Sequence, residues 1–196
     1  MKKIFSYLMI WRSLPVMLVY KIISNETKDK IDQDMNRLGF LPGVLSVHKL
    51  MFSNTIFRRQ FFVRIHDESP VKYRLVRWTY KPLACLEISS TTKQIGGGLQ
   101  IFHGYSTIIF CHSMGKNCSV YQNVTIGRGK KVNDIDVPII GDNVTIFTGA
   151  IIIGGVHIGN NAKIGAGAVV VKDVPENATV VGQAARILKQ QGEIHE

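Results

Sequence analysis

An aliphatic residue recurs at nearly every sixth position through the second half of this chain. A period of six matches neither the 3.6-residue turn of an α-helix nor the two-residue alternation of an ordinary strand. It is typical of a β-solenoid, in which each hexapeptide forms one flat side of a coil and stacked coils share a core. We therefore predict that these side chains point inward. The twelve positions are Ile95, Ile101, Ile108, Met114, Val120, Ile126, Ile140, Ile146, Ile152, Ile158, Ile164 and Val170.

Small or short side chains follow the later members of this series at an offset of four residues. We expect them to fill the narrow space inside each corner, while intervening glycines and asparagines supply turn conformations with positive φ. Cys118 belongs to this set and needs no chemical role. The set is Cys118, Val124, Val144, Ala150, Val156, Ala162, Ala168 and Val174.

The period is interrupted at two places. Between Ile101 and Ile108 the spacing is seven, so one residue is extra, directly after His103. Between Ile126 and Ile140 the spacing is fourteen, which predicts a loop over residues 127–139. Breaks in a regular pattern tend to mark functional sites. We therefore expect a site beside His103 and near this loop.

Residues 1–82 lack the period of six and are predicted to be helical. One helix should begin near Ser24 or Asn25, which are favourable N-caps, and stop at Gly39. The stretch 46–67 has apolar residues at roughly helical spacing. Pro70 suits the first turn of a further short helix. The aromatic residues of this part are interpreted as helix packing.

Charge is unevenly distributed between the two parts. Residues 1–83 hold 15 Lys and Arg against 6 Asp and Glu, whereas residues 84–196 hold 9 against 8. A basic part attracts anions. Because no nucleic-acid-binding motif accompanies it and the arginines do not cluster, a solvated basic helical face is favoured and nucleic acid is not an expected partner. Weak contact with an anionic membrane surface is the remaining alternative.

The cysteines and the start of the chain indicate the compartment. Cys85, Cys111 and Cys118 form an odd set without metal-ligand spacing. The apolar run near the start is interrupted by Arg12, no small-residue cleavage site follows, and no stretch approaches the ~20 apolar residues of a spanning helix. We predict a cytoplasmic protein with reduced thiols.

Several segments of the repeat resemble a known family. They are "IGGGLQIFHGYSTII", "VYQNVTIG", "VPIIGDNVTIFTGAIIIGG" and "IGNNAKIGAGAVVVKDVPENATVVGQAARIL". The chain is similar to left-handed β-helix acyltransferases, in particular serine acetyltransferases and their relatives in surface-polysaccharide gene clusters. The resemblance implies a left-handed parallel β-helix over residues 83–188, with loop 127–139, after an α-helical domain of residues 1–82 and before a tail of residues 189–196. It also implies a homotrimer or a dimer of trimers.

The resemblance implies acetyl transfer from acetyl-CoA to the hydroxyl of a small acceptor, with His103 as general base. The chemistry favours the same role, because unperturbed imidazole titrates at roughly 6.5 and can accept a hydroxyl proton near neutral pH. A backbone N–H beside Gly104 would stabilise the oxyanion. Family members carry an acidic residue about one coil earlier, and Glu87 falls within one residue of that place. Glu87 would orient His103; otherwise it is an exposed residue at the entry to the repeat.

In this family CoA lies along the cleft between neighbouring subunits, over the later coils. Small residues at such positions let the pantetheine arm approach the backbone, and basic residues meet the phosphates. The alternative for the small residues is that they only form turns and fill corners. The positions that match are Thr148, Gly149, Ala166, Lys172, Gly182 and Arg186. No metal is expected.

Three positions depart from serine acetyltransferases. The family has an Arg-His pair in the loop before the proline, where this chain has Asp136 and Val137. It also has Asp directly before the catalytic histidine, where this chain has Phe102. Those residues hold the charged groups of serine, so the acceptor is either L-serine or a neutral hydroxyl such as that of a surface-polysaccharide sugar. Tyr105 would line the acceptor pocket.

Two other functional classes are alternatives for a chain with these repeats. A γ-type carbonic anhydrase uses the same kind of helix but needs three zinc-binding histidines, two of them spaced H-x₄-H, and this chain has no such pair. A catalytically silent trimeric scaffold would dock partners through its basic helices. An unchanged turnover of acetyl-CoA after replacement of His103 would favour the scaffold.

Overall fold

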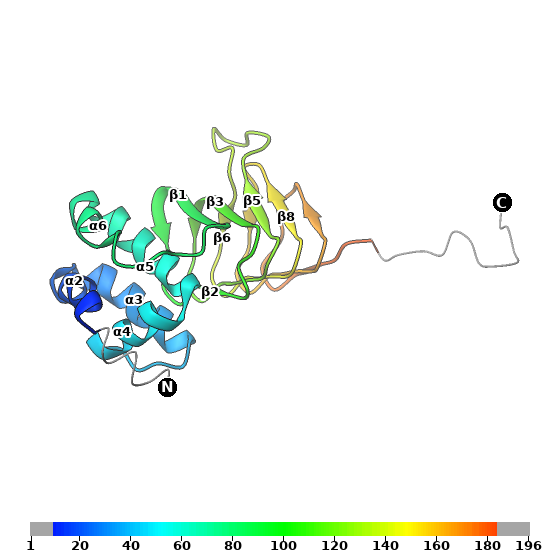
Figure 1. Ribbon diagram of the computed structural model, residues 1–196. Coiled ribbons are helices and arrows are strands. Elements are labelled where there is room, and N and C mark those ends of the chain that lie inside the picture. Colours follow the sequence, from blue (N-terminus) through cyan, green and yellow to red (C-terminus); the bar gives the residue numbers. More distant parts are fainter. Residues whose placement is uncertain (1–9, 184–196) are drawn as a thin grey trace, which may run out of the picture.

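The computed structural model describes residues 10–183. Five helices pack together at one end of the molecule, and short parallel strands stack into a β-helix that extends away from them (Figure 1). The helices are α2 (Ile10–Ile22), α3 (Asn25–Arg37), α4 (Val44–Ser53), α5 (Thr55–Glu68) and α6 (Pro70–Val76). Among them, none is long and apolar enough to cross a membrane.

Capping residues set the helix starts. The Ser24 hydroxyl accepts the Thr27 N–H at the start of α3, and Pro70 stands in the first turn of α6. Both starts agree with the sequence prediction. The stretch 46–67, by contrast, is broken between α4 and α5. Asn54 interrupts it, because its side-chain oxygen accepts the backbone N–H groups of Ile56 and Phe57 and starts a new helix.

Twelve strands form the β-helix. They are β1 (Leu86–Ile95), β2 (Gln100–Ile101), β3 (Thr107–Met114), β4 (Ser119–Val120), β5 (Thr125–Gly127), β6 (Ile139–Ile140), β7 (Thr145–Ile146), β8 (Ile151–Ile153), β9 (His157–Ile158), β10 (Lys163–Ile164), β11 (Val169–Val170) and β12 (Thr179–Val180). All pairings between named strands are parallel, for example β2 with β4 with β7, and β5 with β8 with β11. This confirms the predicted mostly β solenoid after a helical part.

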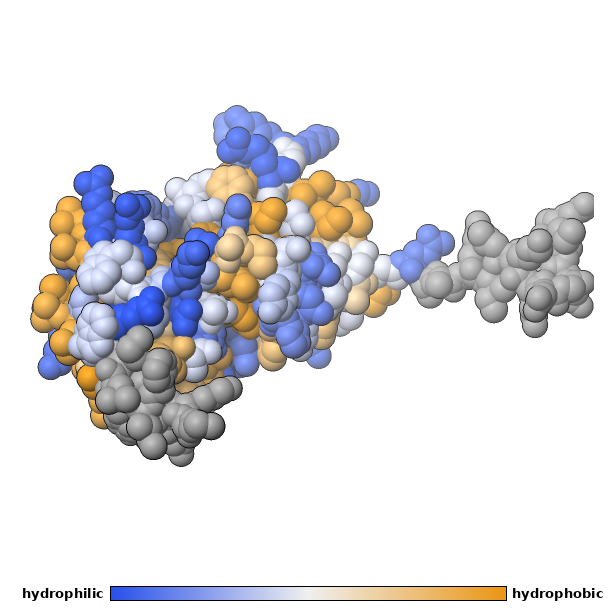
Figure 2. Space-filling view, viewed as in Figure 1, coloured by the Kyte–Doolittle hydropathy of each residue, from blue (hydrophilic) through white to orange (hydrophobic). Residues whose placement is uncertain are grey.

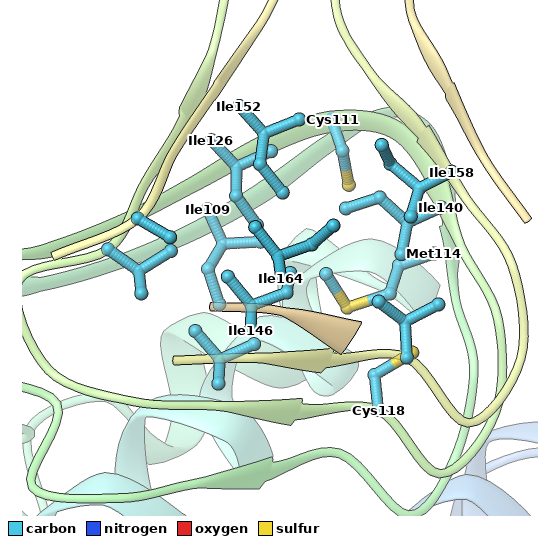
Figure 3. Close-up of a cluster of buried hydrophobic side chains, with 14 of the residues drawn as sticks. Ile109, Cys111, Met114, Cys118, Ile126, Ile140, Ile146, Ile152, Ile158 and Ile164 are labelled. Atoms are coloured by element: carbon cyan, nitrogen blue, oxygen red, sulfur yellow. The ribbon is translucent and has the colours of Figure 1, made fainter. Parts of the chain in front are cut away.

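The core of the β-helix is the aliphatic series itself. Eleven of its twelve members are buried, and so are all eight small residues of the offset series. Figure 3 shows Ile126, Ile140, Ile146, Ile152, Ile158 and Ile164 converging from the sides of the coils, together with Cys118.

The exception is Ile108, which the sequence pattern assigned to the interior. Its side chain is 42% exposed, whereas the next residue, Ile109, is fully buried. The reason is the pairing of β3 with β1, which aligns Ile109 with the buried Ile88 and Ile108 with the exposed Glu87. A shift by one residue in a strand exchanges its two faces.

Candidate active site

His103 lies on the turn between β2 and β3, and its side chain is exposed. Its φ is 63°, and Gly104 and Ser106 also have positive φ, of 66° and 48°. Such a conformation is uncommon for a residue other than glycine and costs about 1–3 kcal/mol, so the surrounding structure must enforce it. The Gly104 N–H is donated to the Phe102 carbonyl over 2.7 Å. That N–H is therefore not free to stabilise an oxyanion.

The turn packs against the segment that enters the first coil. A β-carbon added at Gly104 would lie 3.3–3.4 Å from side-chain atoms of Leu83 and Leu86, and the Thr107 N–H donates to the Cys85 carbonyl. Glu87, the predicted orienting residue, follows directly after Leu86 and is exposed. Within residues 10–183, no hydrogen bond or ion pair joins Glu87 to His103.

Several of the predicted CoA positions lie on the same edge of the β-helix as His103. The Gly149 N–H donates to the Gln122 carbonyl, and the Gly167 N–H donates to the Thr148 carbonyl, so residues 122, 148–149 and 166–167 stack in successive coils. Gly182 continues this column, since a β-carbon there would lie 3.2 Å from the Ala166 carbonyl oxygen. The structure thus aligns Thr148, Gly149, Ala166 and Gly182 below the coil of His103.

Lys172 lies on a different edge. It follows β11, which pairs with β8, and β8 pairs in turn with β5, where loop 127–139 begins. Within one chain, Lys172 is therefore grouped with the loop and separated from the Thr148 column. Arg186 lies outside the described residues.

Loop 127–139 projects from the β-helix as a hydrophilic protrusion (Figures 1 and 2). Arg128 Nε is 2.8 Å from a carboxylate oxygen of Asp136, so these opposite charges are paired with each other. Val137 is only 1% exposed. Its side chain therefore packs inside the molecule and does not face an acceptor. Tyr105, which was expected to line a pocket, is exposed beside His103.

Phe102, which was singled out from the sequence, belongs to a row of three aromatic rings beside His103, and neither of the other two was singled out. Phe102 stacks on Tyr121, with ring centroids 4.4 Å apart, and Tyr121 lies against Phe147 at 5.3 Å. We call these three residues the aromatic ladder. The signal was present, since each follows an inward-pointing aliphatic residue, Ile101, Val120 or Ile146.

A family model and known relatives match the chain. The model "Bacterial transferase hexapeptide (six repeats)" matches residues 138–172. A serine acetyltransferase of Bacillus pumilus is 43% identical over 183 residues, which cover 89% of this chain and 80% of that protein. The chain belongs to the serine acetyltransferase family. With another member, from Synechococcus elongatus, the match is 36% identical but spans only 50% of that protein's length.

Solved structures of serine acetyltransferases share this fold. The Neisseria gonorrhoeae enzyme, crystallised in complex with serine, has a TM-score of 0.62 at 25% identity, over 84% of this chain and 70% of that chain. A serine acetyltransferase in complex with CoA has a TM-score of 0.60 at 21% identity, over 88% of this chain and 73% of that chain. The second likeness concerns the fold alone.

Metal-binding side chains do not gather in the described part of the chain. Among residues 10–183, no group of three or more His, Cys, Asp or Glu residues is arranged to hold a metal ion. Cys111 and Cys118 are buried and Cys85 is exposed. The geometry of the candidate site thus consists of His103, the aromatic ladder and the column of small residues below them.

Proposed function

We propose that the protein transfers the acetyl group of acetyl-CoA to a hydroxyl, with His103 as the general base. The observation that carries this proposal is the placement of His103. It stands exposed on a left-handed turn, at the break of the repeat, on the edge that also carries Thr148, Gly149, Ala166 and Gly182. Family membership supplies the reaction class, and this edge supplies a base beside a column of small residues.

The chemistry requires one proton acceptor and one leaving group. Neutral His103 accepts the proton of the acceptor hydroxyl while the hydroxyl oxygen attacks the thioester carbonyl carbon. The carbon–sulfur bond then breaks, and the CoA thiolate leaves and takes the proton from the imidazolium. The products are an acetyl ester and CoA thiol. Base catalysis by a positioned side chain contributes typically about 10²–10⁴ to the rate.

Glu87 is proposed as a positioning residue for His103. It follows Leu86, which packs against Gly104, the residue after His103. Because the Glu87 side chain is exposed, a rotamer change that brings its carboxylate to the His103 ring costs little. Beside the ring, the carboxylate would orient the imidazole and stabilise its protonated form.

Two acceptors compete. The names of the matched relatives and the serine bound to the Neisseria structure favour L-serine. A neutral hydroxyl is favoured by the residues of this chain. Phe102 is apolar, Val137 is buried and Asp136 is paired with Arg128, so none of the three offers a free charge to an amino acid.

We also propose that the protein assembles as a homotrimer or a dimer of trimers, as the family resemblance implies. Helix α2 supports a contact at the helical end. Its residues Val16 and Val19 face the helical core, yet Trp11, Leu14 and Leu18 on the other side are 56–61% exposed. A helix that is apolar all round is usually buried. The molar mass measured by light scattering would decide between the two assemblies.

The proposed function is tested by measuring thiol release from acetyl-CoA in the presence of serine, simple sugars and nucleotide-linked sugars. His103→Asn is the informative variant, because asparagine accepts positive φ readily but cannot act as a base near neutral pH. We expect kcat to fall by about 10²–10⁴ with an unchanged circular dichroism spectrum. His157→Asn, at an exposed histidine of β9, is the matched control and should keep its activity. Unchanged turnover in His103→Asn would contradict the role of His103 as the base, and no thiol release from the wild type with any acceptor would favour the scaffold.

A further inference from the structure

The aromatic ladder is built into the backbone register of the coils. The N–H groups of Phe102, Tyr121 and Phe147 donate to the carbonyls of Val120, Ile146 and Ile164, over 2.8–3.0 Å. These bonds hold the three residues at equivalent places in successive coils, and neighbouring parallel strands are about 4.8 Å apart. The ring separations of 4.4 and 5.3 Å match that spacing. The ladder is therefore a rigid row that runs along the edge of the β-helix from the coil of His103.

The ladder is not required by the core. The residues that fill the interior of these coils are Ile101, Val120 and Ile146, which are almost fully buried. The ladder residues follow them and are only half-buried. The rings lie face against face, so the ladder presents their edges as one continuous apolar strip, and accessible aromatic side chains contribute strongly to binding. Three such rings on one edge of a solenoid indicate a binding surface.

A polar row runs beside the aromatic one. Each ladder residue is followed by a hydrogen-bonding residue: His103, Gln122 and Thr148. The side-chain oxygen of Gln122 is buried and has no hydrogen-bond partner in the described part of the chain. An unsatisfied buried carbonyl costs about 1–3 kcal/mol, so a rotation of the Gln122 side chain that brings this oxygen to a ligand donor at the edge would be favourable.

The four turn segments of this edge carry no formal charge besides that of a protonated His103. Segments 102–106, 121–123, 147–149 and 165–167 contain no Asp, Glu, Lys or Arg. A zwitterion such as serine would find no partner for its ammonium or carboxylate group on these four segments. A neutral molecule with hydroxyl groups needs no charged partner, so the lack of charged side chains does not weaken its binding.

We propose that the aromatic ladder is the acceptor platform and that the acceptor is a neutral sugar ring. The inference rests on the proposed function and narrows its acceptor. A pyranose ring has an apolar face of C–H groups and a rim of hydroxyls. The face lies against the ring edges of Phe102 and Tyr121, the rim bonds to Gln122 and Thr148, and one hydroxyl meets His103. That hydroxyl gives its proton to His103 and its oxygen to the acetyl carbon, the carbon–sulfur bond breaks, and the CoA thiolate leaves and takes the proton from His103.

The test compares acceptor kinetics in ladder variants of the full chain. Wild type, Tyr121→Leu and Phe147→Leu are assayed for thiol release with free and nucleotide-linked hexoses and with serine. Phe110→Leu is the matched control, because Phe110 is a half-buried aromatic of β3 that lies against Arg128 and outside the ladder. We expect sugars to exceed serine in kcat/KM. Tyr121→Leu should raise the sugar KM about tenfold and leave the KM for acetyl-CoA unchanged, whereas Phe110→Leu should change neither.

Three results would overturn the inference, and they separate it from the proposed function. If serine is the better acceptor while His103→Asn abolishes turnover, the sugar platform is wrong and the proposed function stands. If the ladder variants raise the KM for acetyl-CoA instead, the ladder binds CoA. If no acceptor supports thiol release, the proposed function fails and the inference fails with it. Phe147→Leu provides the same comparison if Tyr121→Leu does not fold.

Discussion

Arg64 of α5 binds Asp34 of α3 through two parallel contacts, Nε to Oδ2 at 2.6 Å and Nη2 to Oδ1 at 2.9 Å, and both side chains are buried. The same guanidinium donates to the carbonyls of Ile95 and Gly96, and Asp34 accepts the Leu99 N–H. This pair therefore fastens two helices to the first coil of the β-helix. It fixes the helical part relative to the edge that carries His103.

Removal of one partner should be strongly destabilising. Asp34→Ala leaves the Arg64 charge buried without its counterion, and we expect a loss of about 3–5 kcal/mol in the free energy of unfolding. Urea titration followed by circular dichroism measures it. Glu26→Ala breaks the exposed Lys30–Glu26 pair and serves as control, and its urea midpoint should stay close to that of the wild type because exposed ion pairs contribute little. Equal losses for the two variants would contradict the role of the buried pair.

A row of asparagines is a second source of stability. Asn161 donates to the Asn177 side chain and accepts from the Asn143 side chain, and its φ is 59°. Asn161→Ala loses both hydrogen bonds and places an alanine in a left-handed conformation, so we expect a loss of about 2 kcal/mol. Asn161→Gly loses the same hydrogen bonds but tolerates the backbone. If Asn161→Gly were as destabilised as Asn161→Ala, the backbone conformation would not contribute.

Much of this fold could be predicted from the sequence because its core is local and periodic. Every coil repeats the same inward residue, so six-residue spacing alone placed Val120, Ile126 and Ile164 in the interior. Ile108 was misplaced because two adjacent isoleucines satisfy the pattern equally, and only the pairing of β3 with β1 decides between them. The Arg64–Asp34 pair could not be predicted, since it joins elements 30 residues apart.

The candidate site also contains residues that could be predicted from the sequence and residues that could not. The break of the repeat drew attention to His103, and the family resemblance supplied the positions of the Thr148 column; their roles stay predictions. Phe102 was named from the sequence, but its ring neighbours Tyr121 and Phe147 were not, because these contacts join residues that are 19 and 26 positions apart in the sequence. The family resemblance groups Lys172 with the CoA positions, and because CoA lies between neighbouring subunits in this family, that role stays a prediction. The strand pairing places Lys172 with the loop.

The turn at Gly104 should be sensitive to a single methyl group. Its φ is 66°, and an added β-carbon would lie 3.3 Å from atoms of Ile101 and Leu83. Gly104→Ala should therefore shift the backbone beside His103, and we expect kcat to fall about tenfold or more, because small misplacements of a catalytic group are costly. Gly127→Ala is the control, since nothing lies within 4 Å of its added β-carbon. Full activity in Gly104→Ala would contradict this prediction, because it would show that the turn accepts a methyl group without displacing His103.

The three thiols should react at very different rates. Cys85 is exposed, whereas burial raises the pKa of Cys111 to about 12 and that of Cys118 to about 11. Because the thiolate is the reactive form, a disulfide reagent at pH 8 should modify one thiol per folded chain and three per unfolded chain. In the Cys85→Ser variant, no thiol should be modified until the chain is unfolded. Rapid modification of a second thiol in the folded chain would contradict the burial of Cys111 and Cys118.

The same two thiols should make the protein less stable at alkaline pH. Their pKa values are raised in the folded chain from an ordinary value of roughly 8.5, so the unfolded chain loses these protons first. The stabilisation is fully present below about pH 8.5 and is lost as pH rises toward the folded values of about 11 and 12. At pH 10 the loss is about 2 kcal/mol per thiol. Urea midpoints at pH 8 and pH 10 measure it, and the double variant Cys111→Ala/Cys118→Ala should lose markedly less between the two pH values than the wild type. An equal loss in both proteins would assign the alkaline effect to other groups.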